Sequence, residues 1–198
     1  FFIASGFVRP HLPFYAPKKY WDLYNRDSIS MAKNTERPKN APKSLHGSGE
    51  FRQYHLAGLK PKNDDFKKMM KHGYYASVTY TDKLIGDIIK ELKALELDKN
   101  TIIVLWGDHG WQLGEHNYWG KHNTLHVSLR VPLIIKVPGK TETIKHTAIV
   151  ESTDLFPTIC ELAGVNLPEN QLQGKSFKTI LTKPNLNFRE FAYSRFFF

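Results

Sequence analysis

The stretch TIIVLWGDHGWQLGEHNYWGK, from Thr101 to Lys121, contains the clearest indications of both the fold and the site. Its opening TIIVLW has no polar alternation, which is typical of a strand buried on both faces of a parallel sheet. The run ends at Gly107, and two acids, two imidazoles and a lysine follow within fourteen positions. Because open α/β sheets bind ligands beyond the carboxyl ends of their strands, the sequence predicts a binding site directly after Trp106.

Helix and strand patterns alternate around this stretch. Apolar residues at three- and four-residue steps predict a long helix after Asp64, with a break near Gly73 because so long an uncapped helix is unusual. A later helix is predicted to be capped at residues 152–154 and to end at Gly164. The expected elements are strands over residues 1–7, 101–106, 131–139 and 190–196, and helices over 64–97 and 152–165. This alternation indicates an α/β layered domain.

The segment between the first strand and the long helix has weak periodicity. Residues 15–62 are predicted to form a long irregular excursion, with one short helix in APKKYWDLY beginning near Pro17. Before it, the sequence RPHLPF places His11 between two prolines, which predicts an extended and rigid path for this residue.

Composition limits the class of protein. The 198 residues, 41% hydrophobic and 24% charged, fit a globular chain, and no apolar run approaches the roughly 20 residues of a membrane-spanning helix. The net charge of +9 suits an anionic partner or simply aids solubility, and no motif for binding nucleic acid is present. The single cysteine, Cys160, excludes an internal disulfide and is expected in the core.

The segment GDHG has the residue types of a metal site. Asp108 offers a hard oxygen and His109 a nitrogen, a pair suited to a divalent cation. Gly107 and Gly110 permit the sharp bend that would aim both groups at one point. The alternative is a loop whose polar groups are satisfied by backbone hydrogen bonds.

Four stretches in the same order resemble the sulfatase family of the alkaline-phosphatase-like superfamily. They are GFVRPHLPFYAPKKY, YYASVTYTDKLIGDIIKELKALELDKNTIIV, GDHGWQLGEHNYWGKHNTLHVSLRVPLIIKVPG, and DLFPTICELAGV with LQGKSF and AYSRF. The core RPHLPF looks most like iduronate-2-sulfatase-like members. The resemblance implies part of a layered α/β/α domain, with residues 1–182 as the C-terminal part of the catalytic domain. Residues 183–198 would begin a C-terminal subdomain, and the N-terminal half would lie upstream.

The resemblance also implies roles for four residues. Asp108 and His109 match metal ligands, with Ca²⁺ expected and Mg²⁺ possible. Lys121 matches the lysine that contacts the substrate sulfate, and His11 the histidine that faces the sulfate and its leaving oxygen. The alternatives are a solvated Lys121 and a His11 that only hydrogen-bonds backbone. The implied partner is a sulfated saccharide, and the implied compartment is secreted, periplasmic or lysosomal.

Other side chains near these four have less specific roles. Arg9 and Arg195 are candidate anion contacts. The aromatic residues of the loop are expected to pack it, with a cleft for sugar rings as the alternative. They are Trp111, Tyr118 and Trp119. Four further polar residues are expected to support the site or to lie at the surface. They are Glu115, His116, His122 and His126.

The family's nucleophile is not found in these residues. It is a formylglycine made in a C/S-x-P-x-R motif, and Cys160 lies in TICELAG without the required proline and arginine. The family's other metal carboxylates are also missing, so the 198 residues alone are expected neither to bind the ion tightly nor to hydrolyse sulfate esters. Two alternatives stay open: a phosphatase, phosphodiesterase or phosphonate monoester hydrolase of the same superfamily, and a non-catalytic module that binds anionic polymers.

Overall fold

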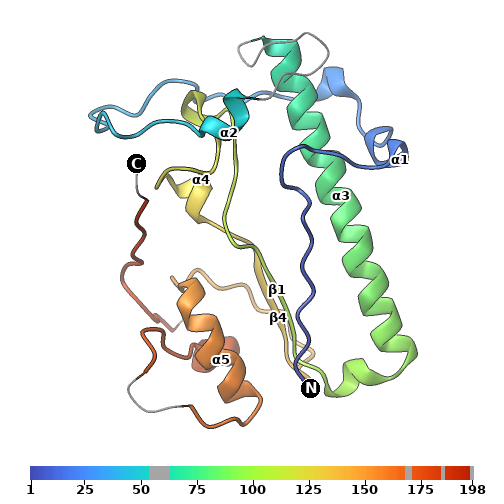
Figure 1. The fold of residues 1–198 in the computed structure, drawn as a ribbon. Coiled ribbons are helices and arrows are strands. Elements are labelled where there is room, and N and C mark those ends of the chain that lie inside the picture. Colours follow the sequence, from blue (N-terminus) through green and yellow to red (C-terminus); the bar gives the residue numbers. More distant parts are fainter. Residues whose placement is uncertain (54–62, 168–170, 184–185, 197–198) are drawn as a thin grey trace. The chain divides into compact units, whose positions relative to one another are not determined.

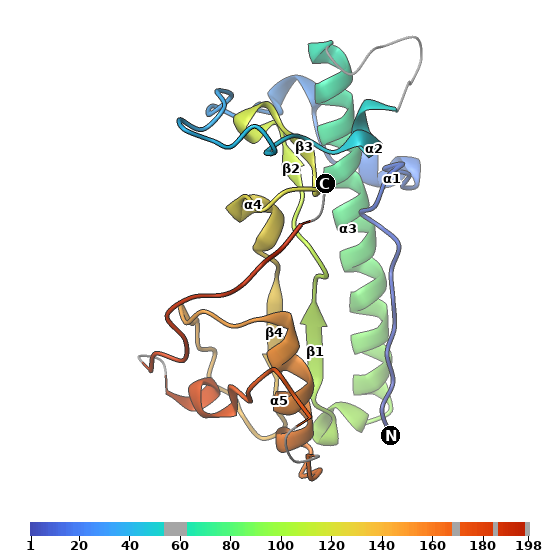
Figure 2. The same ribbon diagram turned by 60° about the vertical axis from the view of Figure 1, so that its left-hand side comes forward.

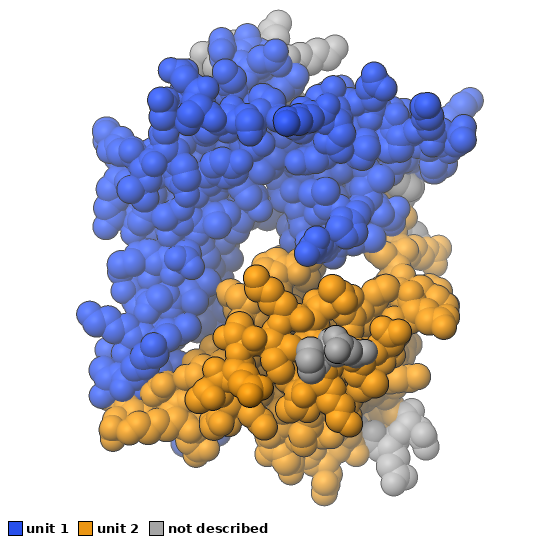
Figure 3. All heavy atoms as spheres, turned by 180° about the vertical axis from the view of Figure 1, so that it is seen from behind, with its two compact units in different colours: residues 1–94, 109–130, 198 blue, residues 95–108, 131–197 orange. Residues whose placement is uncertain are grey.

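The computed structural model describes residues 1–53, 63–167, 171–183 and 186–196. Two compact units are distinguished in Figure 3. Unit 1 comprises residues 1–94 and 109–130, and unit 2 comprises residues 95–108 and 131–197. The proposed boundary between residues 182 and 183 is a different division and stays a prediction.

Unit 1 is organised by the helix α3 (Asp64–Ala94), which confirms the predicted long helix. The short helix α1 (Lys18–Trp21), preceded by Pro17 as expected, packs beside it (Figure 1). The predicted break near Gly73 is wrong, because α3 continues through that position. Its absent side chain has a packing reason instead: a Cβ on Gly73 would lie 2.7 Å from the Trp21 ring.

Two glycines of α3 should therefore respond in opposite ways to alanine. A Cβ on Gly86 meets nothing within 4 Å, so Gly86→Ala is expected to stabilise the protein by about 1 kcal/mol through helix propensity. A Cβ on Gly73 would also approach Phe14 Cβ to 3.0 Å, so Gly73→Ala is expected to destabilise it by about 1–3 kcal/mol. Urea unfolding of both variants measures the difference, and equal stabilities would contradict this account of the α1–α3 contact.

The excursion over residues 15–53 is largely irregular, as predicted, and residues 54–62 of that prediction lie outside the described residues. Its regular pieces besides α1 are the 3₁₀ turn η1 (Arg26–Ser28) and the helix α2 (Gly49–Arg52). Unit 1 is completed by β2 (Gln112–Leu113), which pairs antiparallel with β3 (Trp119–Gly120), by η3 (Glu115–Asn117), and by α4 (His126–Leu129). One buried cluster joins the loop ahead of α1 to α2, α3, β2 and β3. It consists of Leu12, Phe14, Phe51, Phe66, Met70, Trp111, Leu113 and Trp119.

In unit 2, β1 (Ile103–Trp106) pairs with β4 (Leu133–Lys136), as Figure 2 shows. The pairing is antiparallel, with Trp106 opposite Leu133, so the predicted parallel neighbour is wrong. Nor is β1 buried on both faces, because Trp106 is 44% exposed. An apolar run indicates an expected degree of burial but carries no information about the direction of the neighbouring strand.

The helix α5 (Leu155–Leu162) packs against this sheet through Leu155. Its predicted cap is confirmed as the 3₁₀ turn η4 (Ser152–Asp154), and Gly164 follows the helix with φ +70°. Cys160 is half-buried rather than in the core. The remaining 3₁₀ turns of unit 2 are η2 (Leu97–Asn100) and η5 (Lys178–Thr182).

Two predicted strands are not formed. Residues 1–7 and 190–196 are irregular, and Phe2 and Ile3 are 80% and 85% exposed. A strand requires hydrogen bonds to a neighbour, and neither segment is paired with any described residue in a sheet. None of the helices in the described part of the chain combines the length and apolar character needed to cross a bilayer.

Candidate functional site

The contact between His11 and Lys121 is the centre of the candidate site. The two residues are separated by 110 positions, yet Lys121 Nζ lies 3.0 Å from His11 Nε2. His11 comes from a loop ahead of α1, and Lys121 follows β3 directly. Both belong to unit 1. Of the four residues proposed for the site, these two are therefore brought into direct contact.

The loop that carries His11 is a turn, not the extended path predicted from its prolines. His11 N donates to Val8 O at 2.9 Å and closes the turn. Proline is found in turns as well as in extended segments, so the prolines alone did not distinguish the two. Arg9, a candidate anion contact, instead donates to the backbone oxygens of Tyr15 at 3.0 Å and His11 at 3.1 Å. Leu12 is buried in the core and anchors the loop, so the backbone that carries the His11 ring is held in place.

The hydrogen bonds of His11 define its tautomer. Its Nδ1 lies 2.8 Å from Leu12 O, and because a carbonyl oxygen can only accept, Nδ1 carries the proton. Nε2 then accepts from the Lys121 ammonium. A second proton on Nε2 would set two donors against one another, so the observed geometry belongs to the neutral imidazole.

The aromatic side chains of this loop are packed, and the Trp111 ring lies against the His11–Lys121 pair. The Trp111 ring lies 5.7 Å from Lys121 Nζ, a cation–π distance, and 6.3 Å from the His11 ring. Trp119 is buried and stacks on Phe51, while the Tyr118 hydroxyl donates to the backbone of a neighbouring loop. The predicted packing role of these three aromatic residues is confirmed, since each is at least nine-tenths buried.

Asp108 and His109 follow β1, as predicted. His109 Nδ1 lies 2.8 Å from Gly110 O, so in the neutral ring Nδ1 carries the proton and Nε2 the lone pair that a metal requires. A carboxylate and such an imidazole fit a divalent cation. They would supply only two of the six to eight ligands that an ion such as Ca²⁺ takes. Within the described ranges, no group of three or more His, Cys, Asp or Glu side chains is arranged to hold a metal.

Three of the other polar residues near the site make supporting hydrogen bonds, as predicted. Glu115 accepts from Leu113 N at 2.7 Å, and His116 Nδ1 bonds to Glu36 O at 2.9 Å. His122 Nδ1 lies 3.1 Å from Ser48 Oγ. Burial, and then the charge of Glu115, raise the pKa of the Tyr74 phenol.

Glu50, in α2, was not predicted. Its Oε2 lies 3.7 Å from Lys121 Nζ, on the same ammonium that contacts His11. No motif surrounds Glu50, and its segment has weak periodicity, so spacing alone gave no signal for it.

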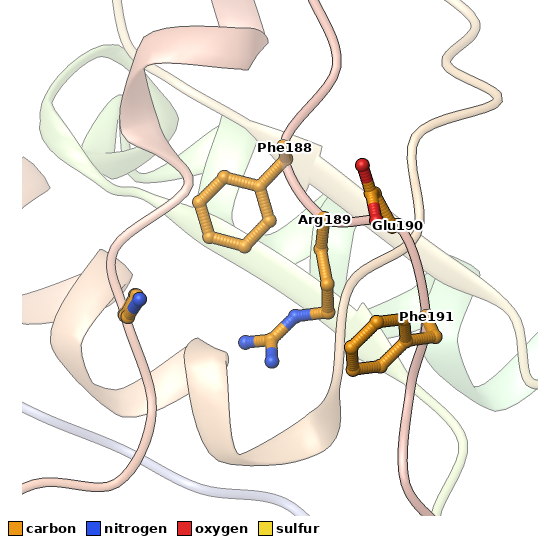
Figure 4. A pocket seen from close by; sticks show the side chains of 5 residues that line it. Phe188, Arg189, Glu190 and Phe191 are labelled. Atoms are coloured by element: carbon orange, nitrogen blue, oxygen red, sulfur yellow. The ribbon is translucent and has the colours of Figure 1, made fainter.

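A separate cavity of about 270 Å³ lies in unit 2, and Figure 4 shows Phe188, Arg189 and Phe191 around it. The Arg189 guanidinium is already paired with carboxylates, at 2.7 Å from Glu151 and 2.7 Å from Asp154. Asp154 is fully buried. We therefore assign this network to the stability of unit 2, not to a ligand site.

Comparison with known proteins identifies the family. Iduronate 2-sulfatase of Mus musculus is 32% identical over 201 residues, covering 85% of this chain and 36% of that protein. A phosphonate monoester hydrolase from Silicibacter pomeroyi superposes with TM-score 0.72 and 29% identity, over 89% of this chain and 36% of that chain. A protein solved in complex with its substrate D-glucosamine-2-N,6-O-disulfate superposes with TM-score 0.56 and 32% identity, over 64% and 26% of the two chains.

The chain thus spans about a third of the length of the curated relatives it matches. The predicted fold class, part of an alkaline-phosphatase-like sulfatase domain with mixed helices and strands, is confirmed by these superpositions. The sulfatase family model matches residues 1–165. On this match, and on an identity above 30% to a curated sulfatase, the chain belongs to the sulfatase family.

Proposed function

We propose that this chain is part of a sulfuric ester hydrolase that acts on a sulfated saccharide. The observation that carries the proposal is the contact between His11 and Lys121 at 3.0 Å, in a chain of the sulfatase family. The two side chains place two nitrogens close together, the Lys121 ammonium as a donor and His11 Nε2, which becomes a donor once it is protonated. A sulfate ester needs such a pair, because negative charge accumulates on its oxygens as the bond to the sugar oxygen breaks.

Each of the two residues has a distinct role in the proposed reaction. Lys121 donates to the sulfate oxygens, and His11 faces the leaving oxygen and protonates it. General-acid catalysis of this kind is typically worth about 10²–10⁴ in rate. His11 must first gain a proton on Nε2, where it would face the Lys121 ammonium. A sulfate group accepting from both residues removes that conflict, so substrate binding itself prepares the acid.

Asp108 and His109 would hold the divalent cation, for which we propose Ca²⁺, with Mg²⁺ as the alternative. When bound, such an ion polarises a sulfate oxygen as a Lewis acid. The further ligands and the formylglycine nucleophile would come from outside these 198 residues. The residues of this chain contribute two ligands, the ammonium of Lys121 and the imidazole of His11.

The proposed substrate is a sulfated saccharide. The net charge of +9 suits an anionic glycan, and one related protein was solved with D-glucosamine-2-N,6-O-disulfate as its substrate. Because sulfated glycans are extracellular polymers, we propose a secreted, periplasmic or lysosomal location. Hydrolysis of a phosphonate monoester is the second candidate, favoured by the similarity to the Silicibacter pomeroyi enzyme.

A binding and turnover experiment tests the proposal against a non-catalytic anion-binding module. With the proposed nucleophile-bearing segment present, the protein is expected to hydrolyse an aryl sulfate, and Asp108→Ala and Lys121→Ala are each expected to lower turnover by about 10² or more. Retention on a sulfated polymer is measured in parallel as a function of salt. Salt-dependent retention that survives both substitutions, without turnover by the unsubstituted protein, would favour the binding module. A C/S-x-P-x-R motif in that segment supports sulfate over phosphoryl chemistry.

A further inference from the structure

The side chain of Glu50 shares the ammonium that the proposed function assigns to substrate. Lys121 Nζ lies between His11 Nε2 at 3.0 Å and Glu50 Oε2 at 3.7 Å. The Lys121 side chain is only 15% exposed, so it has little contact with solvent. Its ammonium is therefore influenced mainly by these two neighbours. A negative charge therefore lies 3.7 Å from the cation that would receive the anion.

Glu50 is held in this position by its own surroundings. Ser48 caps α2 by accepting from Glu50 N at 3.2 Å, and the same hydroxyl contacts His122. His122 Nε2 in turn lies 3.9 Å from Glu50 Oε1. A Cβ on Gly120 would approach Ser48 Cβ to 2.4 Å, so the two segments meet closely. The carboxylate therefore lies among these neighbours, although its side chain is 35% exposed.

One oxygen of this carboxylate is also shielded. Glu50 Oε2 is inaccessible to solvent and accepts no hydrogen bond from the residues that the structure describes. The negative charge of Glu50 is balanced by the Lys121 ammonium, 3.7 Å from Oε2. No hydrogen-bond donor among the described residues neutralises Oε2 further. The Glu50 side chain as a whole is 35% exposed, so solvent screens its charge in part, but the charge still acts on an anion bound at Lys121.

Distance makes the repulsion unavoidable for any ligand of Lys121. An oxygen that accepts from Lys121 Nζ at about 2.8 Å lies at most about 6.5 Å from Glu50 Oε2, since the ammonium is 3.7 Å from that atom. This separation is shorter than the Debye length of about 8 Å at physiological salt. The repulsive energy scales with the ligand charge, so a dianion is penalised twice as much as a monoanion.

We propose that Glu50 is a specificity-determining residue that selects monoanionic esters over dianionic ones. A sulfate ester carries one negative charge and so does a phosphonate monoester, whereas a phosphate monoester carries two above its second pKa of about 6. The inference rests on the proposed function, because it assumes that Lys121 binds the anionic group. It goes further by assigning the rejection of phosphate monoesters to one residue of this chain.

The test compares two probes that differ by one charge. Affinities for methyl sulfate, a monoanion, and inorganic sulfate, a dianion, are measured at pH 8 and low salt by following the imidazole signals of ¹⁵N-histidine-labelled protein. Glu50→Gln is expected to tighten binding by about 3-fold for methyl sulfate and about 10-fold for sulfate. Glu36→Gln, which removes an exposed carboxylate of the same unit, is the matched control and should leave the ratio of the two affinities unchanged.

A second variant separates charge from structure. Glu50→Asp keeps the charge and should keep the unsubstituted ratio, whereas a merely structural role predicts that both variants weaken both probes by similar factors. Equal factors for the two probes in Glu50→Gln, or no change, would overturn the inference. The proposed function fails separately, if neither probe binds or if binding is insensitive to Lys121→Met.

Discussion

Lys121→Met is expected to lower kcat/KM for an aryl sulfate by about 10²–10³, since it removes the charged donor that we propose acts on the oxygens where negative charge develops. Methionine replaces most of the aliphatic side chain, but it has no atom in place of Nζ and so loses the charge and the cation–π contact with the Trp111 ring. The assay uses a protein that includes the proposed nucleophile-bearing segment. Lys33→Met removes the same charge from an exposed position of unit 1 and should stay within about 2-fold of the unsubstituted protein.

The contact with His11 sharpens this prediction. If the two residues act on one sulfate group, as their separation of 3.0 Å indicates, the losses from Lys121→Met and His11→Ala should not multiply in the double variant. Fully multiplicative losses would mean that the residues act independently. A Lys121→Met enzyme within 3-fold of the original would remove Lys121 from the mechanism.

Gly110→Ala is expected to destabilise the protein by about 3 kcal/mol or more, at least as large a loss of stability as that expected for Gly73→Ala. An added Cβ would lie 1.9 Å from Val127 O and 2.9 Å from Arg130 O. Both are backbone atoms of the segment that ends α4, and Gly110 N already donates to Ser128 O at 2.8 Å. The backbone must therefore separate to admit a methyl group, and that hydrogen bond is broken.

Chemical denaturation of Gly110→Ala and Gly6→Ala measures this effect. Gly6 is the matched control, because a Cβ there meets nothing within 4 Å. A loss below about 1 kcal/mol for Gly110→Ala would show that the loop carrying His109 is not tightly packed against the residues after α4.

The sequence predicted those elements that depend on local chemistry. The periodicity of α3, the cap of α5 and the stop at Gly164 were all confirmed, because each depends on residues within a few positions. The partner of β1 depends on the path of the chain over about thirty residues, and its antiparallel direction was not predicted. The strands expected over residues 1–7 and 190–196 required partners that local sequence does not specify.

The candidate site divides in the same way. Gly110 was expected to serve a sharp bend, yet its φ is not in the left-handed region, and the close approach of Val127 O is what excludes a side chain. The pairing of His11 with Lys121 follows from family resemblance but not from spacing, since 110 residues separate them. Glu50 has neither motif nor periodicity, and only coordinates relate it to Lys121.

His11 and His109 are oriented in the same way, each by the carbonyl oxygen of the residue that follows it. His46 repeats the arrangement with Gly47 O at 3.1 Å. Because every amino acid supplies that oxygen, substitution of a neighbouring side chain cannot delete it. The orientation of each ring therefore depends on the path of the main chain. Neighbouring side chains can be substituted without reorienting the imidazoles.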